Sequence, residues 1–194
     1  MSTGNLDRPV TKGKRIASSA VLSCPHKAQI RQIIDIKKDT PMARIKMEFP
    51  GDPAFSTEID LRISDINYGG HLGHDSILSL THEARVRFFR HFGFSELNVD
   101  GPGIILSDVA VVYKSESFYG ETMTVEVAVC DFVKYGCDLV YRLSEKETGR
   151  EVALAKTGIV FMDYAERKVV PIPGKFKKLF KLFKEQGYFL EIQP

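Results

Sequence analysis

The chain has 194 residues, of which 43% are hydrophobic and 27% are charged, and its formal net charge is +2. This composition is typical of a soluble globular protein, and the length suits one domain with extensions. So small a net charge argues against nucleic acid as a partner. Three cysteines without a C-x-x-C spacing cannot form a full disulfide framework, which favours a reducing, cytoplasmic location.

The chain divides into three parts by composition. Residues 1–52 form an N-terminal extension, because they are rich in lysine, serine and proline and poor in periodic apolar positions. Residues 53–173 form the domain, which a Phe-Pro-Gly-Asp-Pro turn at 49–53 precedes. Residues 174–194 form a basic amphipathic tail.

The tail places apolar side chains on one face of a helix among five lysines, and the apolar residues are Phe176, Leu179, Phe180 and Phe183. We favour a terminal helix packed on its own domain with solvated lysines. The less favoured interpretation is contact with a membrane surface or a partner.

Hydrophobic periodicity predicts one long helix among strands. Ile59, Leu61 and Ile63 alternate with charged residues in a strand at 57–64. A helical period then runs over 71–92, with an apolar surface so broad that a sheet should wrap most of it. Four more strands joined by short turns are expected at 104–113, 122–132, 137–143 and 152–162. The pattern predicts an α+β fold with one antiparallel sheet around the helix.

Groups able to do chemistry concentrate between residues 64 and 93. Asp65, Asn67, His71 and His74 lie around two adjacent glycines, and Glu83 follows in the helix. The frame reads Asp65-Ile-Asn-Tyr-Gly-Gly-His-Leu-Gly-His74, and Glu83-Ala84-Arg85 arrives later without a gap. Further motifs in the same order are Tyr119-Gly120-Glu121, Glu147-Thr148-Gly149 and Val170-Pro171-Ile172-Pro173.

These motifs and the order of elements resemble the hotdog-fold acyl-CoA thioesterases, specifically the 4-hydroxybenzoyl-CoA thioesterase-like branch, over residues 55–173. The resemblance implies a hotdog fold and hydrolysis of a fatty or aromatic acyl-CoA without a cofactor. Where that branch usually has a catalytic Asp, this chain has Asn67. Other hotdog thioesterases are similar in pairing an Asn here with a carboxylate on the central helix, which makes Glu83 the candidate carboxylate.

The candidate roles follow from thioester chemistry. Glu83 would be the general base or nucleophile, while Asn67, which cannot ionise, would orient the water or the carbonyl. His71 or His74 would help to position either group. Gly69 and Gly70 would let the substrate approach the backbone before the helix N-terminus, where free N–H groups can hold an oxyanion.

Basic residues and a second subunit would complete the site. Candidates for contacts with the phosphates of coenzyme A are Arg85, Arg87, Arg90 and Lys114. By resemblance the chain should form a homodimer or homotetramer with each site at an interface, because a single sheet has open edges.

Simpler and rival interpretations stay open. Glu83 and Arg87 are also spaced for an ordinary i,i+4 ion pair, and the two glycines could serve only the turn. A group of His71, His74, Asp75 and His82 could bind a metal, as in the all-helical HD phosphohydrolases, although no metal is the favoured expectation. The absence of the usual Asp favours a second alternative, a non-catalytic acyl-binding or regulatory module.

Overall fold

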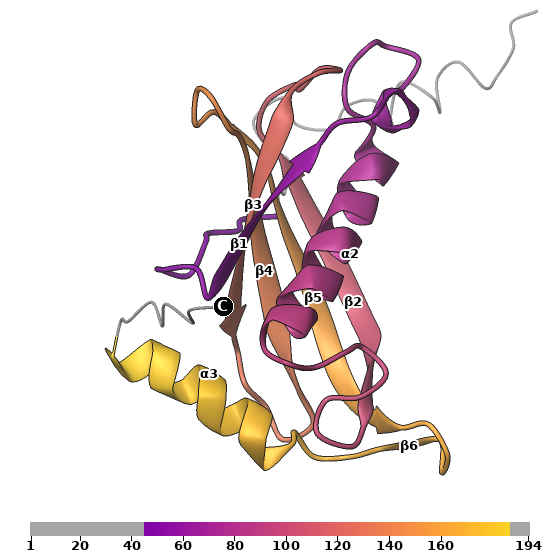
Figure 1. The fold of residues 1–194 in the computed structure, drawn as a ribbon, viewed down its shortest axis with the longest axis vertical. Coiled ribbons are helices and arrows are strands. Elements are labelled where there is room, and N and C mark those ends of the chain that lie inside the picture. Colours follow the sequence, from indigo (N-terminus) through magenta and orange to yellow (C-terminus); the bar gives the residue numbers. More distant parts are fainter. Residues whose placement is uncertain (1–44, 187–194) are drawn as a thin grey trace, which may run out of the picture. The chain divides into compact units, whose positions relative to one another are not determined.

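A computed structural model of the chain describes residues 45–186, with side chains described as far as residue 180. Most of the predicted N-terminal extension and the end of the tail therefore lie outside the described residues. The elements, shown in Figure 1, are β1 (Phe55–Asp60), a 3-10 helix η1 (Ile63–Asp65), α2 (His74–His91), β2 (Gly103–Tyr113), β3 (Thr122–Cys130), β4 (Gly136–Glu145), β5 (Glu151–Asp163), β6 (Lys168–Val169) and α3 (Gly174–Gln186).

One antiparallel sheet forms the body of the described chain. Its strands follow the order β1-β3-β4-β5-β2, and the short β6 pairs with β5. Helix α2 lies across one face of this sheet, as Figure 1 shows. The prediction of an α+β fold with an antiparallel sheet and one long central helix is confirmed.

Alternation along the strands explains which face of the sheet meets α2. Met123, Val125 and Val127 are fully buried on β3, and Leu139 and Leu143 are fully buried on the paired β4. Side chains of a strand point to opposite faces in turn, so these residues share one face. Helix α2 contributes Ile77, Leu80, Ala84 and Phe88 to the same core at three- and four-residue intervals.

The first strand is shorter than predicted. It ends at Asp60, and Ile63 begins η1 with its side chain 71% exposed, so the prediction that Ile63 faces the core was wrong. The cause is local, because the Asp65 carboxylate accepts a hydrogen bond from the Arg62 N–H at 2.8 Å and from its guanidinium at 3.2 Å. These bonds close the chain into a turn where a strand would have to continue extended.

Helix α2 is covered on one side within this chain. Its other side carries exposed residues such as Leu78, His82 and Glu83, so the expectation of a helix wrapped on most sides is not met by the described residues. The helix also begins three residues later than predicted. Gly73 is still extended (φ −68°, ψ 145°), and the preceding Leu72 N–H donates to the Ser117 carbonyl at 2.7 Å.

The start of the tail packs into the same core. Phe176 and Phe180 of α3 are buried, and the Phe180 ring is stacked on Phe88 of α2 with centroids 5.3 Å apart. This packing supports the favoured interpretation of the tail. Within the described residues, no helix is both long and apolar enough to cross a membrane.

Candidate active site

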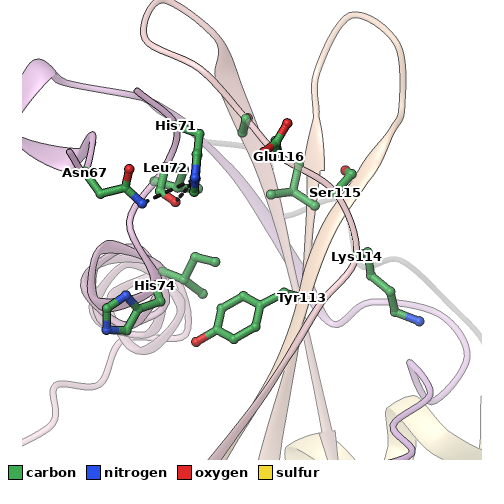
Figure 2. Close-up of a pocket in the computed structure, with 11 residues that line it drawn as sticks. Asn67, His71, Leu72, His74, Tyr113, Lys114, Ser115 and Glu116 are labelled. Carbon is green, nitrogen blue, oxygen red and sulfur yellow. Dashed lines mark hydrogen bonds between the residues drawn. The ribbon is translucent and has the colours of Figure 1, made fainter. Parts of the chain in front are cut away.

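A cavity of about 340 Å³ lies between the turn that precedes α2 and the end of β2. Figure 2 shows its two walls. The first wall comes from the turn and the start of α2 and consists of Asn67, His71, Leu72, His74 and Ile77. The second comes from β2, the loop after it and β5, and consists of Tyr113, Lys114, Ser115, Glu116, Ser117 and Val152. Its volume is in the range of small-molecule sites.

Asn67 organises the turn in the first wall. Its Oδ1 accepts a hydrogen bond from the Gly69 N–H at 2.8 Å, and its Nδ2 lies 3.3 Å from His71 Nδ1. The amide can donate only to a ring nitrogen that lacks a proton, so this contact belongs to the neutral tautomer with its proton on Nε2. The Leu72 carbonyl, 3.4 Å from the same Nδ1, would be the partner of the other tautomer. An Asp at this position could not donate, so Asn67 is suited to an unprotonated Nδ1.

Each of the two positions in the turn is occupied by glycine for a different structural reason. Gly70 has φ +82°, a left-handed conformation that a side chain would strain. A Cβ on Gly69 would lie 2.9 Å from His71 Nε2 and 3.1 Å from Asn67 Oδ1, so these two side chains would have to shift to make room for it. The pair thus allows the His71 ring to fold back over the turn, and neither glycine belongs to the cavity lining.

The N-terminus of α2 opens beside this turn. Gly73 is the N-cap and no side chain caps the helix, which leaves the backbone N–H groups of the first turn directed outward. These groups and the helix dipole favour a negative charge at this point. His74, the first residue of the helix, lines the cavity there.

The loop in the second wall is held by Arg150, which the sequence analysis did not select. Its guanidinium donates to both Glu121 oxygens at 3.0 and 3.1 Å, to Ser115 Oγ at 3.2 Å, and to the Glu116 carbonyl. The Ser117 hydroxyl also donates to Glu121. Burial raises the pKa of Glu121, but the hydrogen bonds from Ser117, the Phe118 N–H and Arg150 outweigh it, so this pKa lies below its ordinary value.

The structure brings together four of the predicted site residues, since Asn67, His71, His74 and Lys114 all line the cavity. Lys114 also lies 3.8 Å from Glu151. Four residues of the second wall were not predicted from the sequence, namely Tyr113, Ser115, Glu116 and Ser117. The one sequence signal for the loop between β2 and β3 is the break in the strand pattern at 114–120.

Glu83 is not part of the cavity lining. It accepts a hydrogen bond from Arg87 Nε at 2.7 Å, and Arg87 in turn donates to the Glu58 carbonyl at 2.9 Å. Glu83 and Arg87 thus form the i,i+4 ion pair that the simpler interpretation expects, and Arg87 also contacts β1. Their catalytic and substrate-binding roles remain predictions.

Arg85 and Arg90 also lie outside the cavity lining. Arg85 is buried, and its Nε donates to Glu96 at 2.6 Å, while Arg90 is exposed. His82 contacts the other oxygen of Glu96 at 3.2 Å. Within the described residues there is no group of three or more His, Cys, Asp or Glu side chains that could hold a metal, so the metal-site alternative finds no support there.

The comparisons with known proteins agree with this fold. The model of the thioesterase-like superfamily matches residues 61–180, more than half of the chain. No curated protein matches. Among solved structures, a 1,4-dihydroxy-2-naphthoyl-CoA thioesterase from Synechocystis is similar with a TM-score of 0.60 and 20% identity, covering 66% of this chain and 95% of its own.

Two further solved structures give the same result. A DHNA-CoA thioesterase from Staphylococcus aureus has a TM-score of 0.60 at 21% identity, covering 71% of this chain and 97% of its own. A thioesterase superfamily protein from Jannaschia sp. has a TM-score of 0.62 at 18% identity, covering 72% and 87%. At such identities these likenesses establish the hotdog fold.

Proposed function

The chain belongs to the thioesterase-like superfamily, and from this premise we propose that it hydrolyses a fatty or aromatic acyl-CoA to a free acid and coenzyme A. Thioester hydrolysis as the class of reaction follows from the superfamily. The observation that carries the proposal to this site is the cavity, where Asn67 and His71 stand beside the uncapped N-terminus of α2.

The first wall has the parts needed to polarise a thioester carbonyl. A developing oxyanion would be held by the first-turn N–H groups of α2, whose donors and dipole are fixed before the substrate arrives. His71, with Nδ1 facing the Asn67 amide, would present Nε2–H as a donor to the carbonyl or to the attacking water. His74 would line the entry of the acyl group.

Coenzyme A would lie toward the second wall. Lys114 is the predicted cation that lines the cavity, and a lysine is suited to a phosphate as a mobile point charge. A phosphate contact is less well supported for the three predicted arginines, Arg85, Arg87 and Arg90, because none of them lines the cavity. Arg85 and Arg87 are also already paired with Glu96 and Glu83. For these three a phosphate contact would require the approach of another subunit or a change of partner.

A second copy of the chain is part of the proposal. Strand β2 is at the edge of the sheet, and Leu106, Val109 and Tyr113 on it are exposed. An edge strand with exposed apolar residues favours pairing with another chain, and Tyr113 also lines the cavity. A homodimer or homotetramer with sites at its interfaces, located in the cytoplasm and needing no cofactor, remains our prediction.

The proposal is tested by incubating the purified full chain with a panel of short, long and aromatic acyl-CoAs and following the release of free thiol. We expect turnover of at least one of them, and we expect Asn67→Ala to lower kcat by about 10²-fold, the typical effect of losing one positioned donor. Measurable acyl-CoA binding without turnover on any member would instead establish the non-catalytic acyl-binding module.

A further inference from the structure

Hydrolysis at this cavity requires a group that accepts the proton of the attacking water, and Asn67 cannot do so. Among the described residues, Glu116 is the one carboxylate that lines the cavity. We infer that Glu116, in the loop between β2 and β3, is the general base of the reaction, an inference that rests on the proposed function. It assigns the catalytic carboxylate to the wall opposite the central helix.

The position of Glu116 relative to the first wall suits this role. Figure 2 shows Glu116 across the cavity from His71 and Asn67, with Ser115 beside it. A water between the two walls would have a carboxylate on one side and the turn and helix N-terminus on the other. This is the arrangement in which a base can remove a proton while donors receive the charge that develops on the carbonyl.

The backbone at Glu116 is fixed although its side chain is exposed. Arg150 donates to the Glu116 carbonyl, and Ser115 Oγ donates to the Glu151 carbonyl at 2.7 Å. On the other side of Glu116, Ser117 is fully buried and its carbonyl accepts the Leu72 N–H of the first wall. The loop is thus bonded to both β5 and the opposite wall, so the backbone of Glu116 is held in place relative to the first wall.

Two other carboxylates near the walls of the cavity are occupied by structural partners. Asp65 is buried in its ion pair with Arg62, and Glu121 accepts from Arg150 and Ser117. The part of the chain that the structure describes places no hydrogen-bond donor or cation on the Glu116 carboxylate. Glu116 therefore has a free acceptor in the cavity, whereas a proton transfer to Asp65 or Glu121 would break an existing bond.

The chemical step balances with water as the only co-reactant. The Glu116 carboxylate takes one proton from water, and the oxygen forms a bond to the thioester carbonyl carbon. The tetrahedral intermediate then expels the sulfur with the electron pair of the C–S bond, and the proton held by Glu116 passes to that sulfur. The products are the free acid and the thiol of coenzyme A, and Glu116 is again a carboxylate.

The test compares four variants of the full chain on whichever acyl-CoA the wild type hydrolyses. Glu116→Gln keeps the size of the side chain and removes its basicity, and we expect kcat to fall about 10²- to 10⁴-fold with little change in KM. Glu116→Asp should retain part of the lost activity. Glu147→Gln, at an exposed position in the turn at the same end of the sheet, is the matched control and should behave as wild type.

Glu83→Gln distinguishes the two candidate carboxylates. A folded Glu116→Gln protein that keeps wild-type kcat overturns the inference, and loss of activity in Glu83→Gln alone would assign the base to the helix as predicted from the resemblance. A wild-type chain that hydrolyses none of the acyl-CoAs overturns the proposed function and this inference with it. Circular dichroism and thermal melting establish that each variant is folded.

Discussion

The substitution Phe176→Ala tests whether α3 belongs to the folded domain or is a surface element available to a membrane. Phe176 has no exposed surface. Its ring centroid lies 4.7 Å from that of Phe180 and 5.3 Å from that of Phe161 on β5. It therefore joins α3 to the sheet, and its removal would leave a cavity between the two.

The expected loss can be worked from this burial. Truncating a fully buried phenylalanine to alanine costs about 3–5 kcal/mol, because the lost transfer free energy adds to the cost of the cavity. For a chain of this size each kcal/mol lowers the melting temperature by about 2–4 °C, so a fall of about 6–20 °C is expected. If the apolar face of α3 served only to bind a membrane, Phe176 would contribute nothing to the free energy of unfolding or to the melting temperature in solution.

Thermal and urea unfolding of the full chain measure both effects. Lys178→Ala, on the exposed side of the same helix, is the matched control and should change stability by no more than about 0.5 kcal/mol. If Phe176→Ala were as stable as this control, α3 would not be packed as observed. Binding of the tail to lipid vesicles would then become the preferred interpretation.

Two further predictions concern the walls of the cavity. Gly70→Ala should destabilise the protein by about 1–2 kcal/mol in urea unfolding, because alanine is strained at the left-handed φ of +82°; an unchanged midpoint would show that the turn relaxes freely. Glu121, whose pKa is lowered in the folded state, should stabilise the protein above its ordinary pKa and lose that contribution as the pH falls through the lowered value. Unfolding curves between about pH 5 and 3 should thus show a smaller acid-induced loss for Glu121→Gln than for wild type, and equal losses would refute this.

Periodicity predicted the sheet and the helix because both depend on which residues face a common core. The alternation of Met123, Val125 and Val127 and the spacing of Ile77 and Phe88 describe burial directly. The same signal failed where polar contacts decide the backbone. Ile63 continues the apolar alternation, yet the side chain of Asp65 bonds back to Arg62 and ends the strand.

The sequence predicted the first wall of the site but little of the second, and the reason is physical. Asn67, His71 and His74 are close in sequence, so a local motif could identify the first wall of the cavity. The second wall depends on Arg150, which reaches Glu121 and the Glu116 carbonyl from 29 and 34 positions away. No spacing rule relates such residues, because the β4–β5 and β2–β3 connections meet only after the sheet has formed.

The geometry also explains how an amide can stand where related enzymes have an aspartate. An aspartate at position 67 would both hold the turn and accept a proton, whereas Asn67 holds the turn through Oδ1 and donates through Nδ2 toward His71. The donor role means that residue 67 supplies no base, and in the tautomer that accepts from Asn67 the His71 ring keeps Nε2–H as a donor. A proton acceptor must then come from elsewhere. The wall fixed by Arg150 offers one at Glu116, while Glu83 is already paired with Arg87. With asparagine in place of aspartate, positioning and proton transfer are separate tasks. In our proposal, Asn67 in the first wall positions the reacting groups, and Glu116 in the opposite wall transfers the proton.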